Sequence, residues 1–197
     1  MLRAIICDLD GVIRLWDDRD TAAIEQRHQL PAGCIMAAAW PLVGRATSGE
    51  IDDAAWRLDV RDGLVRAHGP AAGPAVTAWC QLAGRIDADV VALLAEQRAS
   101  GRRIALLTNA TTRLEADLAA AGLDQAFDAV VSSARARLTK PDPRIFLVAA
   151  ERLGCPPETC VFIDDSPGNV EAARAVGMTG IRFVGAADLR ARLTALA

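Results

Sequence analysis

The chain has 197 residues, of which 52% are hydrophobic, so it can bury the core of one sizeable domain or of a compact domain that carries a smaller one. A formal net charge of −3 excludes the broad basic surface that nucleic-acid binding requires. Five cysteines without a CxxC spacing give no indication of a zinc site or a disulfide framework, and we expect free thiols in a reducing cytosol.

Five apolar segments have the composition of buried strands in a parallel sheet. Two aspartates cut off the first of them, so the N-terminus is too short and too acidic for a signal peptide. No segment approaches the roughly 20 apolar residues of a membrane helix, and we expect a soluble cytoplasmic protein without a membrane partner. The strands are expected at residues 3–8, 102–109, 128–133, 159–165 and 179–184.

Helical patterns separate the later strands, and each ends at a glycine in the position of a helix C-cap. Because strand and helix alternate, the sequence predicts an α/β fold with a doubly wound parallel sheet. The expected helices cover residues 87–100, 111–122, 143–154 and 167–177, and their glycines are Gly101, Gly122, Gly154 and Gly177.

The long segment between the first two strands interrupts this alternation, because a βαβ unit needs only about 30 residues in all. Apolar residues at three-to-four spacing predict three helices in it, at residues 21–30, 48–65 and 73–84. We interpret residues 14–84 as a small helical domain inserted after the first strand, and residues 1–13 and 85–197 as the sheet domain.

Asp8 and Asp10 follow the first strand, and Gly11 lets the chain turn away sharply. Residues two apart on an extended chain project to the same side, so these two like charges repel each other. A divalent cation such as Mg²⁺ would offset the repulsion and keep both groups ionised. The structural alternative is a pair of surface carboxylates that cap the following segment.

Polar residues also stand at or near the ends of other predicted strands. Taken singly, each has an ordinary explanation as a cap, a turn residue or a solvated loop cation. Open α/β sheets, however, place their sites at the carboxyl ends of the strands, where these residues would meet Asp8. We therefore expect one shared site that includes Thr108, Asn109, Lys140, Asp164 and Asp165.

Four stretches of the sequence resemble, in order, the signature motifs of the haloacid dehalogenase-like (HAD) superfamily. They are DLDGV (8–12), LLTN (106–109), KPDP (140–143) and FIDDSPGN (162–169). The wider motif phrases are most similar to the branch that includes sugar-phosphate phosphatases and the phosphatase domain of soluble epoxide hydrolase, where the insertion is a helical cap. The resemblance implies an Mg²⁺-dependent phosphohydrolase acting on a small phosphorylated metabolite, as a monomer or homodimer.

The resemblance also implies a role for each motif residue. Asp8 would be the nucleophile that forms an aspartyl-phosphate, and Asp10 would be the general acid and base. The Asp8 carboxylate, the backbone carbonyl of Asp10 and Asp165 would hold Mg²⁺, with Asp164 as a further ligand or a support for metal-bound water. The phosphoryl oxygens would be bound by the Thr108 hydroxyl, the Asn109 backbone N–H and Lys140, and Asn169 would brace the last motif.

The helical insertion offers fewer candidates. Arg45 is expected to face the phosphate, because an arginine near this point does so in related capped members. The four tryptophans are expected in the core, since an Ala-rich helical domain needs large side chains to pack around. They are Trp16, Trp40, Trp56 and Trp79.

Other functions use similar residues. A phosphomutase has the same four motifs and differs mainly in how its cap excludes water. A 2-haloacid dehalogenase of the superfamily lacks an acid at the position of Asp10 and fits this sequence badly. A receiver-like module has its acid pair on the first strand, whereas Asp164 and Asp165 come late here. An inactive phosphate-binding protein would not need every charged motif residue.

Overall fold

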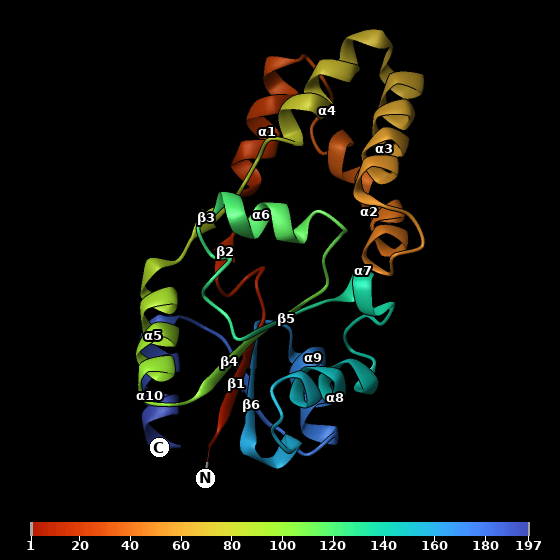
Figure 1. Ribbon diagram of the computed structural model, residues 1–197. Helices are drawn as coiled ribbons and strands as arrows, with labels where there is room; N and C mark the ends of the chain where they lie inside the picture. Colours follow the sequence, from red (N-terminus) through yellow and green to blue (C-terminus); the bar gives the residue numbers. More distant parts are fainter. Residues whose placement is uncertain (1, 197) are drawn as a thin grey trace.

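The computed structural model describes residues 2–196, and a five-stranded parallel sheet forms its centre (Figure 1). The strands occur in the order β5-β4-β1-β6-β7, so the first strand of the chain lies in the middle of the sheet. All five predicted strands are confirmed with small changes at their ends. They are β1 (Ala4–Cys7), β4 (Arg103–Thr108), β5 (Ala129–Ser132), β6 (Cys160–Asp164) and β7 (Thr179–Arg182).

Helices cover both faces of this sheet, as the doubly wound fold requires. Alternate residues of β1 face opposite ways: Ile5 and Cys7 pack in one hydrophobic cluster, whereas Ala4 and Ile6 pack in another. Figure 1 shows α5 and α10 beside one face of the sheet, and α8 and α9 beside the other. The helices of the sheet region are α5 (Ala88–Ala99), α6 (Leu114–Ala120), α7 (Ser133–Ala136), α8 (Pro143–Arg152), η2 (Pro157–Thr159), α9 (Pro167–Ala175) and α10 (Ala186–Ala195).

The helices between residues 18 and 79 gather at the carboxyl end of the sheet, in the upper part of Figure 1. They share a hydrophobic cluster of their own, which includes Ile35, Val60 and Leu64. We call this segment the helical module. It consists of α1 (Asp18–Arg27), α2 (Cys34–Thr47), α3 (Asp53–His68), η1 (Pro70–Ala72) and α4 (Gly73–Trp79).

Three of these helices were expected, but α2 was not. Its sequence CIMAAAWPLVGRAT has apolar residues on nearly every side and contains Pro41, so it lacks the polar face by which a helix is recognised. The expected helix at 48–65 begins later, because the Asp52 side chain caps it by accepting a hydrogen bond from Ala55 N at 2.7 Å. Helix α10 and the short α7 were also not predicted.

A short antiparallel ribbon joins the helical module to the sheet. Strand β2 (Arg14–Leu15) leaves the sheet region and pairs with β3 (Arg85–Ile86), which returns to it. Because both connections run side by side, they form a single narrow link between the two parts of the chain.

All five cysteines are free, which confirms the prediction of free thiols, and Cys7, Cys155 and Cys160 are buried. Within residues 2–196, no helix combines the length and the apolar composition of a membrane span.

Candidate active site

The central strands bring three motifs to one edge of the sheet. Strand β1 pairs with β4 on one side and β6 on the other, with Cys7 opposite both Leu106 and Ile163. The residues that follow in each strand therefore meet at the carboxyl end. Asp8 and Thr108 are buried there, with 7% and 1% of their surface exposed.

Lys140 lies between two of the predicted carboxylates. Its Nζ is 2.8 Å from Asp8 Oδ1 and 2.6 Å from Asp164 Oδ2, and the residue is 5% exposed. This burial rules out a solvated loop cation. Lys140 is the only lysine in the sequence, and the other 21 of its 22 lysine and arginine residues are arginines. This isolated lysine in an arginine-rich sequence already indicates a special role. A compact ammonium fits between two carboxylates where a planar guanidinium is too large.

The Asn109 side chain holds the Lys140 backbone in place. Its Oδ1 accepts a hydrogen bond from Lys140 N at 2.8 Å, and its Nδ2 donates to Lys140 O at 2.9 Å. The peptide bond that follows, Lys140–Pro141, is cis. The sequence predicted only the backbone N–H of Asn109 as a functional group, whereas the side chain positions the loop that carries the lysine.

Asp164 is fully buried and its carboxylate accepts several hydrogen bonds. Besides Lys140, it accepts from Ser166 N at 2.8 Å and from Asn169 Nδ2 at 3.0 and 3.1 Å. These contacts occupy both oxygens, which fits a support for the site better than a direct metal ligand. Asn169 lies where the motif predicted a bracing residue.

Asp165 completes a cluster of three carboxylates. Oxygen atoms of Asp8, Asp164 and Asp165 all lie within 4.8 Å of one another. A Cβ atom at Gly11 would lie 2.4 Å from Asp165 Oδ2, so only glycine lets the Asp165 side chain approach the loop after β1.

The charges of this cluster fit a divalent cation. Burial raises the pKa of Asp8 to about 7; Lys140 opposes the rise and Asp164 adds to it. Burial, followed by the charge of Asp164, also raises the pKa of Asp165. The charge of Lys140 therefore does not cancel the effect of burial on the pKa of Asp8 and of Asp165, and hard oxygen ligands at this spacing are those that Mg²⁺ prefers.

The Asp10 carboxylate points away from this cluster. It accepts hydrogen bonds from Arg14 Nε at 2.7 Å and Nη2 at 3.0 Å, and from Trp16 Nε1 at 2.6 Å. Sequence reasoning did not assign Arg14 to the site and expected Trp16 in the core. Both residues lie on or next to the β2–β3 ribbon, where no repeating pattern indicates which way a side chain points.

A cavity of about 580 Å³ separates the helical module from this edge of the sheet. Asp10 and Asn109 line it on the sheet side, and all four tryptophans belong to its lining. The core prediction is confirmed for Trp56, which is 9% exposed, but it is wrong for Trp16 and Trp40, which are 49% and 70% exposed. Arg45 is not among the lining residues; its Nε lies 2.7 Å from Glu50 Oε1 on the surface, so the structure does not bring it to the carboxylates.

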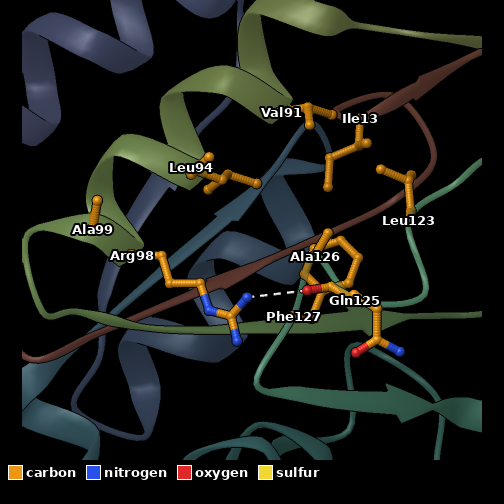
Figure 2. A pocket seen from close by; sticks show the side chains of 10 residues that line it. Ile13, Val91, Leu94, Arg98, Ala99, Leu123, Gln125, Ala126 and Phe127 are labelled. Atoms are coloured by element: carbon orange, nitrogen blue, oxygen red, sulfur yellow. Dashed lines mark hydrogen bonds between the residues drawn. The ribbon is translucent and has the colours of Figure 1, made fainter.

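A second cavity, of about 460 Å³, lies against α5 (Figure 2). Apolar side chains such as Leu94 and Phe127 line it, and Arg98 Nη1 donates a hydrogen bond to Gln125 O at 3.0 Å across its edge. None of the predicted site residues lines this cavity. We therefore place the candidate active site at the sheet edge.

Comparisons with known proteins agree with the motifs. Residues 2–177 match the family of haloacid dehalogenase-like hydrolases. One curated relative is the fructose-1-phosphate phosphatase YqaB of Escherichia coli, 43% identical over 67 residues, which are 34% of this chain and 36% of that protein. Another is a phosphoserine phosphatase of Thermus thermophilus, 38% identical over 92 residues, or 46% of this chain and 37% of that protein. These alignments span well under half the length of the relatives.

Solved structures share the fold over most of the chain. A HAD family enzyme of Bacteroides thetaiotaomicron, in complex with magnesium and inorganic phosphate, has a TM-score of 0.72 at 19% identity and covers 92% of this chain and 94% of its own. An L-2-haloacid dehalogenase of Xanthobacter autotrophicus has a TM-score of 0.66 at 23% identity and covers 100% of this chain and 84% of its own. At such identities the likeness shows the fold alone.

Proposed function

The chain belongs to the haloacid dehalogenase-like hydrolases, and on that premise we propose that it is an Mg²⁺-dependent phosphohydrolase that cleaves a small phosphate monoester through an aspartyl-phosphate. One observation carries the proposal. Two of the three clustered carboxylates, Asp8 and Asp164, pair with a buried lysine, while a fourth acid, Asp10, lies outside the cluster and lines a cavity. This separation provides one carboxylate for attack and another for proton transfer.

Asp8 is the proposed nucleophile. Lys140 Nζ and Leu9 N both lie 2.8 Å from its Oδ1, which fixes the orientation of the carboxylate at the end of β1. An oxygen of Asp8 attacks phosphorus, the bond from phosphorus to the leaving oxygen breaks, and the phosphoryl group is carried on Asp8. Water then attacks phosphorus, inorganic phosphate leaves, and the Asp8 carboxylate is regenerated.

Asp10 is the proposed proton carrier. It protonates the leaving alkoxide in the first step and removes a proton from the attacking water in the second. Arg14 and Trp16 hold its carboxylate at the cavity, on the side where the leaving group would lie.

The other motif residues bind charge. The carboxylates of Asp8 and Asp165 with the backbone carbonyl of Asp10 would hold Mg²⁺, whose positive charge would stabilise the phosphoryl oxygens in the transition state. Thr108, the Asn109 backbone N–H and Lys140 would bind the same oxygens. Asp164 orients Lys140 through its 2.6 Å contact.

We propose that residues 14–84 act as a cap over this site. Three hydrogen bonds already connect the helical module to the sheet region. Ser133 Oγ donates to Thr47 O at 2.6 Å, Thr111 Oγ1 donates to Asp53 Oδ1 at 2.8 Å, and Asp53 N donates to Thr112 Oγ1 at 2.9 Å. With the narrow β2–β3 link, such contacts allow the module to cover the bound ester and exclude water.

A substrate screen tests the function. Purified protein with Mg²⁺ is offered sugar phosphates, nucleotides, phosphoglycolate, acyl phosphates and 2-chloropropionate, and release of phosphate or chloride is measured. We expect phosphate release from at least one monoester and no chloride. Asp10→Asn should lose less activity on an aryl phosphate than on an alkyl phosphate, because the aryl oxygen needs little protonation. Chloride release without phosphate release would favour a dehalogenase and contradict the proposal.

A further inference from the structure

The tryptophans are gathered at one place in the molecule. The chain has four tryptophans, four phenylalanines and no tyrosine, and all four tryptophans line the cavity next to Asp10. Trp56 and Trp79 pack edge to face, with ring centroids 5.6 Å apart, and so belong partly to the core of the helical module. Trp16 and Trp40 leave about half or more of their surface exposed. Exposed apolar side chains that gather around one cavity indicate a binding surface, whereas scattered ones do not.

Six of the charged groups that line the same cavity bind one another. Arg14 pairs with Asp10 and with Asp117, and Asp117 pairs with Arg113. On the opposite side, Arg57 Nε lies 2.6 Å from Asp53 Oδ2. The charges of these six groups are therefore largely offset within the wall. Two further carboxylates of the lining, Asp17 and Asp18, stand at the start of α1, where Asp17 pairs with Arg19. The surface left for a ligand is mainly indole, with apolar additions from Met36, Val43 and Leu82.

Trp16 connects this surface to the chemistry. Its Nε1 donates to the carboxylate of Asp10 at 2.6 Å, and the Arg14 guanidinium lies 4.8 Å from its ring centre. The indole is thus fixed beside the group that protonates the leaving oxygen. The alcohol part of the ester, which carries the leaving oxygen, would therefore lie against Trp16 and its neighbours.

We propose that the substrate is a phosphate monoester whose alcohol carries a flat aromatic ring system, which packs against Trp16 and Trp40. The inference rests on the proposed function and names its substrate class. A cavity of about 580 Å³ is within the roughly 300–1,000 Å³ range of small-molecule sites and has room for a bicyclic ring. A small polyol phosphate would bury less apolar area against the indoles than a flat ring system does.

Two synthetic esters test the contribution of the ring without changing the reactivity of the ester. Ethyl phosphate and 2-(1-naphthyl)ethyl phosphate both release a primary alkoxide of similar basicity, and only the second carries a ring. We expect kcat/KM to be roughly 100-fold or more higher for the naphthyl ester, from the apolar area that it buries. Trp40→Ala should lower the ratio of the two kcat/KM values about tenfold. Trp40 is 70% exposed, so its removal opens no core.

Leu147→Ala is the matched control, because Leu147 is a large apolar residue of α8 that is 44% exposed and lies outside the cavity lining. It should leave the ratio unchanged. Hydrolysis of ethyl phosphate at the same kcat/KM as the naphthyl ester would overturn this inference and leave the phosphatase proposal standing.

Binding of the product alcohol gives a second readout that does not need turnover. Isothermal titration of 2-(1-naphthyl)ethanol should yield a Kd that is about tenfold weaker in Trp40→Ala than in the wild type. If neither ester is hydrolysed, the phosphatase proposal is contradicted for alkyl esters, and this titration decides the ring preference alone. Absence of binding to the wild type, or equal binding to both proteins, would overturn the inference.

Discussion

A methyl group at position 11 would collide with the Asp165 carboxylate. The Cβ of alanine would lie 2.4 Å from Asp165 Oδ2 and 2.6 Å from its Cγ, whereas ordinary contact begins at 3.4 Å. The carboxylate must therefore retreat by about 1 Å, or the loop that carries Asp10 must move. Mg²⁺ demands near-ideal geometry at ligand distances of about 2.0–2.1 Å, so a shift of this size would remove Asp165 as the proposed ligand.

Gly11→Ala should affect both the stability of the protein and its Mg²⁺ requirement. Gly11 has φ of +82°, a conformation that costs alanine roughly 1–2 kcal/mol, and overpacking adds about 1–3 kcal/mol. Changes in the surroundings of a metal typically cost 10–100-fold in affinity or activity, so we expect Gly11→Ala to raise the Mg²⁺ concentration for half-maximal activity at least about tenfold.

Gly33→Ala is the control for this experiment. Gly33 has nearly the same φ, +80°, and a Cβ there meets nothing within 4 Å. It should lower Tm by roughly 2–8 °C through the backbone cost alone and leave the Mg²⁺ requirement unchanged. Phosphatase activity is titrated with Mg²⁺ in both variants. If the half-saturating Mg²⁺ concentration of Gly11→Ala lay within twofold of that of Gly33→Ala, Asp165 would not be a metal ligand.

Three further outcomes follow from the geometry of the site. Lys140→Ala should lower kcat/KM on the order of 10²-fold, because it removes the buried charge beside Asp8. Arg144→Ala, at an exposed position close in sequence, should keep kcat/KM within threefold of the wild type, and equal losses in the two variants would mean that Lys140 has only a structural role. EDTA should abolish turnover and added Mg²⁺ should restore it, whereas Ca²⁺ should substitute poorly because it takes more ligands at longer distances. Full turnover in excess EDTA would show that the mechanism needs no metal. Burial raises the pKa of Cys160 to about 11 and that of Cys7 well above its usual value, so both thiols stay protonated at pH 8. A thiol assay at pH 8 should therefore detect at most the two half-buried thiols, Cys34 and Cys80, before denaturant is added, and a fast-reacting third thiol would contradict the packing.

The sheet and its polar strand ends were predictable because each strand is a short apolar run that stops at a polar motif. In β1, β4 and β6, local composition, length and alternation with helices all indicate the same fold, and parallel pairing then forces the strand ends together. The contact between Lys140 and Asp8 joins residues far apart in sequence, yet it follows from this topology.

The helical module was less predictable, because its details depend on tertiary packing. Helix α2 lacks a polar face, so neither its existence nor the direction of Arg45 in its last turn could be inferred. Trp40 and Trp56 have similar local sequences rich in alanine, but one is exposed and the other is buried. Both indoles line the cavity, and only the packing of the module decides which of them is buried in its core and which stays exposed.

Rapid acid quench shows whether Asp8 carries the phosphoryl group during turnover. Protein with Mg²⁺ is mixed with a ³²P-labelled monoester from the substrate screen and quenched in acid, and label on the precipitated chain is counted and mapped. We expect label on Asp8 in the wild type, no label in Asp8→Asn, and label in Asp10→Asn with an aryl ester. Turnover in the wild type without any covalent label, or label that persists in Asp8→Asn, would contradict this role of Asp8.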